Sequence, residues 1–501
     1  MPDDRTPILV GAGQVTQRDV EPAAAKEPLG LMVDAARLAA ADARGGEPLL
    51  AAVDAIAIAN ILCWRYGNAP RLLAERIGAH PTLEWYSTVG GNTPQWFVNE
   101  MAERIADGRV GVALLGGAEA LRTMLRAQRT GARLGWTAGG AGEPTVVGDR
   151  RDGTTPQENA HGLQLPTQIY PIFENALRAA RGLDLAAHRR RLGTLCAGLS
   201  AVAATNPHAW FPTARSAEEI VTVSPTNRMI AFPYPKLMNA IIEVDQAAAV
   251  LMTSVGRARA LGIPEDRWVY LRGAGDAQDH WFVTERPSLA RSPAIRVAGA
   301  RALAAAGAGI ADVRHLDIYS CFPSAVQIGR EALGIADDDP RPLTVTGGLP
   351  YFGGPGNNYA THAIASMMDR LREDRGALGL VTALGWFVTK HSVGVYSTTP
   401  GAGPWRREPP ASYQGEIDRE PAPPFADQPT GHATVESYTI LHDRDGGPIR
   451  GIVVGRSSDG RRFLANLPDD RALLESCETR ELVGSPGLVA PGSDANRFQP
   501  V

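Results

Sequence analysis

The chain has 501 residues, which is too long for one ordinary hydrophobic core and predicts two to four domains. Its 44% hydrophobic and 21% charged residues are typical of a globular protein, and its net charge of −4 gives no electrostatic reason to expect nucleic acid or a membrane as a partner. Because its four cysteines form no CxxC pair or Cys/His cluster, and no secretory signal or membrane-spanning run is visible, we expect a cytoplasmic protein without disulfides or a metal site.

The first predicted elements alternate strand and helix. Residues 6–17 are an apolar run that ends in glycines, which predicts a buried strand followed by a tight turn. Residues 26–46 are Ala-rich, carry Pro28 in their first turn and end in two glycines, which predicts a helix. Residues 53–62 predict a second strand, so the pattern is that of an α/β protein.

The stretch 89–121 predicts a turn, a helix, a strand and a Gly-rich turn. Thr93 is a suitable N-cap and Pro94 a suitable first helical residue, while Gly90 and Gly91 permit a sharp bend before them. A group at that bend faces the positive end of the helix dipole, which favours a thiolate or an oxyanion. No Cys or Ser stands there.

A second copy of the strand and helix pattern lies near the middle of the chain. Residues 267–279 resemble residues 6–17, with GAGD in place of GAGQ, and residues 292–313 resemble residues 26–46. Either an α/β unit is duplicated, or both copies reflect the Ala-rich helices and Gly turns common in α/β proteins. Between the copies, residues 119–225 are polar and Gly-rich and then helical, and predict an insertion over the α/β core that carries the substrate-specific surface.

The composition changes near the C-terminus. Residues 394–433 are rich in proline and predict a linker or an extended wrapping segment. From residue 434 to about residue 490, apolar runs joined by DRDGG and SSDGRR turns predict β-hairpins, with a short helix and a last strand after them. We therefore expect a small β-barrel-like domain there.

Over residues 1–400 the chain resembles the thiolase superfamily in the order and spacing of five sequence blocks, which are 105–121, 244–252, 318–322, 347–356 and 382–397. With its extra β domain it is similar to the group called thiolase-like protein type 1, whose members are usually labelled acetyl-CoA acetyltransferase. The resemblance implies a duplicated thiolase fold with five layers, α/β/α/β/α. It places the N-terminal half at 1–255, including the loop domain at 119–225, the C-terminal half at 256–400, and a linker with an OB-like β domain at 401–501.

The resemblance also shows that the residues of thiolase catalysis have changed. Gly91 stands where a thiolase has its nucleophilic Cys, and Tyr319 stands where the Asn or His of a motif such as NEAF or HDCF holds a water. Gly354 replaces the His of the GHP motif, and the block around Gly385 lacks the second Cys. Because the covalent step has no nucleophile, we expect no ordinary thiolase activity.

The remaining site candidates are of two kinds. Tyr319, His391 and Cys321 are the catalytic candidates. Each also has a structural alternative: Tyr319 fills the space of the missing His and water, Cys321 is a small buried hydrophobe, and His391 is a structural residue. The predicted substrate-binding residues are Gly91, Asn92, Gly353, Gly354, Gly385 and Asn357. Main-chain N–H groups at Gly91 and near Gly385 are expected to polarise a thioester carbonyl, unless the glycines serve only turns and packing. Lys390 is a candidate contact for a CoA phosphate.

The function implied by the resemblance is that of a thiolase-like protein of lipid metabolism that binds acyl-CoA or another thioester, nominally as an acyltransferase. Two alternatives stay open. One is a retro-aldol lyase that acts on β-hydroxyacyl-CoA through Tyr319, as in sterol-carrier-type thiolase-like aldolases, and the other is a non-catalytic thioester carrier. We expect no cofactor other than CoA as part of the substrate. Thiolases usually dimerise through the sheet edge of the N-terminal half. Because the insertion and the fused C-terminal domain are placed to alter or block this surface, we expect either a monomer or a homodimer.

Overall fold

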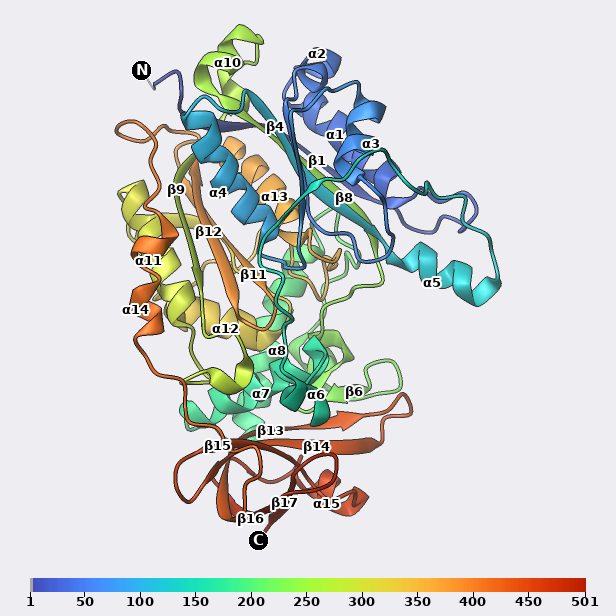
Figure 1. Ribbon diagram of the computed structural model, residues 1–501, viewed down its shortest axis with the longest axis vertical. Helices are drawn as coiled ribbons and strands as arrows, with labels where there is room; N and C mark the ends of the chain where they lie inside the picture. Colours follow the sequence, from blue (N-terminus) through green and yellow to red (C-terminus); the bar gives the residue numbers. More distant parts are fainter. Residues whose placement is uncertain (1–2) are drawn as a thin grey trace.

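The core of the computed structural model, which describes residues 3–501, is one mixed sheet built from two similar halves (Figure 1). Its strand order is β10-β11-β12-β9-β1-β8-β4-β2-β3-β5, and antiparallel pairing of β1 with β9 joins the halves. The strands of the first half are β1 (Pro7–Thr16), β2 (Ala55–Ile58), β3 (Leu83–Ser87), β4 (Val112–Ala120), β5 (Thr145–Val147) and β8 (Asp245–Ser254). Those of the second half are β9 (Val269–Gln278), β10 (Val313–Asp317), β11 (Leu378–Gly385) and β12 (Lys390–Ser397).

Helices cover both halves of the sheet and fill the space between them, which completes the predicted five layers. The central layer contacts strands of both halves and consists of α4 (Thr93–Ala106) and α13 (Tyr359–Glu373). The outer layer of the first half consists of α1 (Pro28–Asp42), α2 (Gly46–Ala51), α3 (Ala69–Ile77) and α10 (Val255–Ala260). On the second half lie α11 (Pro293–Ala306) and α12 (Pro323–Ala332).

The two GAG motifs are not turns, and this part of the sequence prediction is wrong. Both motifs lie inside strands, the first in β1 and the second in β9. A β-carbon at Gly11 would overlap the carbonyl oxygen of Ala39 in α1, and a β-carbon at Gly273 would overlap that of Ala302 in α11. The glycines therefore let an Ala-rich helix lie directly on its strand. Because the same contact occurs in both halves, the duplication of the α/β unit is confirmed.

Helices of the inserted segment lie between the core and the C-terminal domain (Figure 1). The two also touch directly, since Arg462 of the C-terminal domain donates to the carbonyl oxygen of Thr284 at 3.1 Å. The helices of the inserted segment are α5 (Leu121–Thr130), α6 (Pro156–Ala160), α7 (Pro166–Ala180), α8 (Leu185–Ala203) and α9 (Ala217–Val221). Short strands β6 (Met229–Ala231) and β7 (Tyr234–Pro235) follow it and join the C-terminal sheet, where Ala231 pairs with Leu441. Among the helices of residues 3–501, none has the length and apolar character needed to span a membrane.

The predicted C-terminal β domain is a closed five-stranded barrel. The cyclic order is β13-β14-β15-β17-β16, and the closing pairs are β13 with β14 and β13 with β16. The barrel consists of β13 (Gly431–His442), β14 (Pro448–Ser457), β15 (Arg462–Asn466), β16 (Pro486–Ala490) and β17 (Arg497–Pro500), with α15 (Arg471–Ser476) inserted. It lies against α7, where the Asn175 amide donates to the carbonyl oxygen of Tyr438 at 2.8 Å.

The Pro-rich segment before the barrel packs along the surface of the core. Its short helix α14 (Gly415–Asp418) lies beside α11. The backbone N–H of Asp276 in β9 donates to the hydroxyl of Tyr413 at 3.0 Å, and the Gln414 amide donates to the carbonyl oxygen of Gln278 at 2.7 Å. Of the two sequence interpretations, linker or wrapping segment, the structure supports the second.

Strand β5 covers the free edge of β3, the edge at which the resemblance places a dimer contact. Trp85 pairs with Thr145 and Ser87 with Val147 in parallel register. Because an edge whose hydrogen bonds are already used offers no template to a second copy, we expect light scattering to give the mass of one chain, 53.2 kDa. Val146→Pro, which weakens β5, is expected to introduce self-association. A stable dimer of the unaltered chain would contradict this expectation.

Candidate functional site

The bend before α4 is held by side chains from distant parts of the chain. Helix α4 begins at Thr93, so Asn92 and not the predicted Thr93 stands at the cap position. The backbone N–H of Gly90 donates to Oδ1 of Asn357 at 2.8 Å, while the Asn357 amide donates to the carbonyl oxygen of Asn60 at 2.9 Å. Asn357, predicted to bind substrate, therefore has both ends of its amide engaged in fixing the bend.

The space of a thiolase nucleophile is filled by Tyr319. A β-carbon at Gly91 would overlap the Tyr319 hydroxyl, and it would lie 2.8 Å from the ring carbon that carries this hydroxyl and 2.6 Å from the carbonyl oxygen of Leu384. The Tyr319 side chain is buried, with 6% of its surface exposed. Burial raises the pKa of Tyr319 well above its usual value, with the nearby Cys321 adding to the effect. The phenol therefore stays protonated and is able to donate a hydrogen bond but not to act as a base.

Aromatic side chains close the same region from the side of the insertion. Tyr170 of α7 donates its hydroxyl hydrogen to the carbonyl oxygen of Trp386 at 3.0 Å, and its ring stacks on Phe322 with centroids 4.5 Å apart. Cys321 is buried beside Tyr170, and burial raises the pKa of its thiol to about 12. This placement favours the interpretation of Cys321 as a buried apolar side chain, because a thiol with that pKa supplies almost no thiolate near neutral pH.

The glycines at 353 and 354 pack against protein. A β-carbon at Gly353 would overlap the side-chain oxygen of Gln246 in β8, and the φ angle of 112° at Gly353 also favours glycine. The backbone N–H of Gly354 donates to the carbonyl oxygen of Ile241 at 2.7 Å. These contacts support the interpretation that the Gly-rich block serves close packing.

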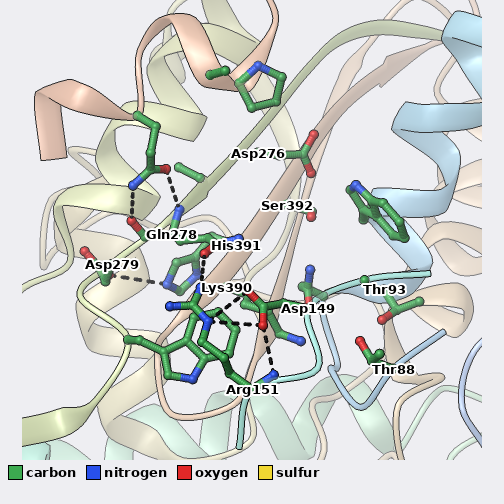
Figure 2. Close-up of a pocket in the computed structure, with 18 of the residues that line it drawn as sticks. Thr88, Thr93, Asp149, Arg151, Asp276, Gln278, Asp279, Lys390, His391 and Ser392 are labelled. Carbon is green, nitrogen blue, oxygen red and sulfur yellow. Dashed lines mark hydrogen bonds and ion pairs between the residues drawn. The ribbon is translucent and has the colours of Figure 1, made fainter. Parts of the chain in front are cut away.

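An open cavity of about 540 Å³ lies on the other side of the start of α4 (Figure 2). It is bounded by α4, the end of β9, the beginning of β12, the loop after β5 and the wrapping segment. Figure 2 shows Lys390 near Asp149 and Arg151 at one end, with Asp276 and Ser392 further along. The lining residues used below are Asn92, Trp96, Asp149, Arg151, Asp276, Asp279, Trp281, Lys390, His391 and Ser392. Its volume lies within the range usual for small-molecule sites, about 300–1,000 Å³.

Lys390 is the buried cation of this cavity, with 6% of its surface exposed. Its ammonium group donates to the carbonyl oxygen of Val89 at 2.7 Å and lies 5.9 and 6.0 Å from the ring centroids of Trp281 and Trp386. Burial lowers the pKa of Lys390 to about 8, with Asp149 opposing the shift and Arg151 adding to it.

Gly90 of the bend and Gly385 of the predicted site leave room for this lysine. A β-carbon at Gly90 would lie 2.6 Å from Nζ of Lys390, and one at Gly385 would lie 2.8 Å from its Cε. Both distances are shorter than a van der Waals contact. In the structure, Gly385 therefore leaves room for Lys390 and for the Asn92 amide, whose Oδ1 would overlap the same β-carbon.

Four polar atoms of the residues that line the cavity are buried without a hydrogen-bond partner among the described residues. They are Oδ1 of Asn92, Oδ1 of Asp276, Nε2 of His391 and Oγ of Ser392. The other carboxylate oxygen of Asp276 accepts from Asn99 at 3.0 Å and from Arg407 at 2.7 Å, and burial raises the pKa of Asp276 to about 6. Each unpartnered polar atom costs about 1–3 kcal/mol, which a bound ligand with matching groups offsets.

His391, a predicted catalytic residue, also lines this cavity, between Lys390 and Ser392 at the beginning of β12. Its Nε2 lies 3.5 Å from Oδ2 of Asp279. Asp279 accepts from the hydroxyl of Ser292 and from the backbone N–H of Ala294 at 3.0 Å, at the start of α11. His391 thus belongs to a buried polar cluster that fixes α11, and its catalytic role stays a prediction.

Sequence reasoning did not single out Asp276, Ser392 or Arg151. One signal was visible: Asp276 is the charged residue of the second GAG copy, where the first copy has the neutral Gln14. A charge inside a buried strand needs a partner or a function. Ser392 lines the cavity because of the register of β12, and Arg151 because of the course of the loop after β5. No local sequence pattern indicates either.

The duplicated α/β unit, the two helices between its halves and the glycine bend that starts α4 define a thiolase-fold protein. The crystal structure of a monomeric SCP2-thiolase like protein type 1 from Mycobacterium smegmatis is 37% identical in sequence over 100% of both chains, with a TM-score of 0.87. The chain belongs to this family of SCP2-thiolase-like proteins of type 1. Family profiles agree: residues 275–398 match the thiolase C-terminal domain-like family, and residues 412–493 match the thiolase-like protein type 1 additional C-terminal domain.

More distant solved structures share the fold alone. The Ltp2-ChsH2(DUF35) aldolase is 20% identical, with 78% of this chain and 97% of that chain covered and a TM-score of 0.59. Human mitochondrial 3-ketoacyl-CoA thiolase in complex with CoA is 15% identical, with 79% and 98% covered and a TM-score of 0.58. A search of the curated proteins finds no significant match.

Proposed function

We propose that this protein binds an acyl thioester without forming an acyl-enzyme. The observation that carries the proposal is the position of the Tyr319 hydroxyl, which fills the space that a side chain at residue 91 would need. Neither a Cys nor any other nucleophile fits at the start of α4 while Tyr319 keeps this position. The covalent step of a thiolase is therefore blocked sterically as well as chemically.

The cavity beside the start of α4 supports a CoA thioester as the ligand. Lys390 and Arg151 supply positive charge suited to phosphate groups, and Trp96 and Trp281 supply apolar walls. The unpartnered atoms are an amide oxygen, a carboxyl oxygen, a hydroxyl and an imidazole nitrogen, a set that complements the N–H and C=O groups of a pantetheine arm. The binding of CoA by a human thiolase of the same fold is consistent with this assignment.

Calorimetry with CoA and acetyl-CoA tests the proposal, together with intact-mass measurement after incubation with acetyl-CoA. We expect binding and no acetyl group retained on the denatured protein. Arg151→Met is expected to weaken binding about tenfold, because it removes one charge-assisted contact, whereas Arg150→Met, at an exposed neighbour outside the cavity lining, is the matched control. An absence of binding up to about 1 mM CoA, or a stable acyl adduct, would reject the proposal.

A second candidate is the retro-aldol lyase, and the observation in its favour is that the protonated Tyr319 phenol stands at the positive end of α4. A phenol in that position donates a proton to the enolate that carbon–carbon cleavage produces, and the proton released from the β-hydroxyl group of the substrate restores the phenol. Tyr319→Phe is then expected to lower the rate of β-hydroxyacyl-CoA cleavage by about 10²–10⁴-fold. Cleavage at an unchanged rate would remove Tyr319 from the mechanism.

A further inference from the structure

We propose that Lys390 is an amine nucleophile that captures an aldehyde or ketone in the cavity as a Schiff base. This goes beyond thioester binding, since it assigns a covalent step, a nucleophile and a second ligand class to the cavity. Four features support it: the residue is one of few lysines, two glycines leave space for its side chain, burial lowers the pKa of its amine, and the neighbouring Asn92 oxygen has no hydrogen-bond partner in the part of the chain that the structure describes.

The choice of residue is informative because lysine is very rare in this chain. Of its 50 lysine and arginine residues, only Lys26, Lys236 and Lys390 are lysines. The first two are exposed. Where the chain needs only a positive charge it carries arginine almost everywhere, including the buried Arg178 and Arg462. A guanidinium neither loses its proton nor forms an imine, whereas a buried amine does both.

Two glycines leave space for the Lys390 side chain. Gly90 and Gly385 come from the α4 bend and from the end of β11, and a β-carbon at either position would collide with the outer atoms of the lysine. Both elements therefore have glycine where a β-carbon would displace the end of the Lys390 side chain or the amide of Asn92. A solvated surface lysine needs no such provision.

The surroundings of the amine lower its pKa, so that its neutral form becomes accessible near pH 8. Within residues 3–501 Lys390 takes part in no ion pair, and Asp149, whose charge acts on it, is paired with Arg151 at 2.6 Å. Of the other acids in the cavity lining, Asp276 lies further along and is paired with Arg407, while Asp279 accepts from the hydroxyl of Ser292. Burial thus outweighs the attraction of the acids, which is why the pKa of Lys390 falls to about 8.

The chemistry balances with the groups present. The neutral amine donates one N–H to Val89 and keeps its lone pair free to attack a carbonyl carbon. As the N–C bond forms, the attacking nitrogen releases a proton and the carbonyl oxygen takes it up, and Oδ1 of Asn92, which has no partner, is placed to accept a hydrogen bond from the resulting hydroxyl. Loss of this hydroxyl as water forms the C=N bond, and hydrolysis returns the amine and the carbonyl compound.

Reductive trapping on the full chain tests the proposal. The protein is incubated with propionaldehyde and cyanoborohydride at about pH 8, the pKa of Lys390, and the labelled amines are mapped by peptide mass spectrometry. Lys26 and Lys236 are internal controls, since an exposed lysine with a pKa of about 10.4 is almost fully protonated there. We expect Lys390 to be labelled at least about tenfold faster than either, with the N-terminal amine resolved on its own peptide.

Two variants test whether the label is attached to Lys390. Lys390→Arg keeps a positive charge and Lys390→Met keeps the apolar chain, and both are expected to lose this label while circular dichroism confirms the fold. Preferential labelling of Lys26 or Lys236, or an unlabelled Lys390 in the folded protein, would overturn the proposal. Thioester binding is decided separately, because Arg151→Met is expected to weaken CoA binding and leave the Lys390 label in place.

Discussion

Gly91→Ala is expected to destabilise the protein by about 1–3 kcal/mol, the usual cost of overpacking a filled site. The added methyl group would overlap the Tyr319 hydroxyl and lie 2.6 Å from the carbonyl oxygen of Leu384, so either the tyrosine or the β11 backbone has to move. The measurement is the free energy of unfolding in urea. Gly198→Ala in α8 is the matched control, because a β-carbon there meets no atom within 4 Å, and it is expected to be neutral or stabilising.

A double-mutant cycle identifies the cause of this destabilisation. Tyr319→Ala removes the ring and leaves a cavity, so alone it also destabilises the fold. In combination with Gly91→Ala, the clash with the phenol is gone, and we expect the pair to cost about 0.5–3 kcal/mol less than the sum of the single changes. Additive effects, or a Gly91→Ala protein as stable as the parent, would show that Tyr319 does not occupy the nucleophile position.

Arg407→Met is expected to cost about 3–5 kcal/mol, because it removes one partner from a buried group of charges. The Arg407 side chain, 3% exposed, binds Glu100 at 2.7 Å, Glu103 at 2.9 Å and Asp276 at 2.7 Å, and so ties the wrapping segment to α4 and β9. The checks are urea unfolding and limited proteolysis, which is expected to cut the segment at 398–430. The exposed neighbour Arg406→Met is the control, and equal stability of the two variants would contradict the assignment.

The loss in the Arg407 variant is expected to depend on pH in a defined direction. Burial already raises the pKa of Asp276 from 3.8 to about 6, against the opposing effect of Arg407. Without Arg407 the pKa of Asp276 rises further, so the folded state takes up a proton that the unfolded state does not hold. The stability deficit is therefore expected to grow as the pH rises through and above 6, and to shrink as it falls below 6 and Asp276 becomes neutral.

Local sequence patterns predicted much of the fold. The Ala-rich helices, the barrel hairpins and the repeated GAG motif each express short-range rules of periodicity, turn chemistry and capping. The GAG motifs were misjudged as turns because glycine permits both a turn and the close approach of a helix to a strand. Only the positions of Ala39 and Ala302 on the covering helices distinguish the two.

By itself, the amino-acid sequence determined that this is a duplicated α/β protein with a barrel, that it belongs among the thiolase-like proteins and that its Cys nucleophile is missing. Only the tertiary structure decided what fills the empty place and where an open site remains. Tyr319 and Gly91 are 228 positions apart in the sequence, and Lys390 is 300 positions from Gly90. Whether such residues meet depends on strand register and on packing across the central layer, which no local pattern of residues encodes.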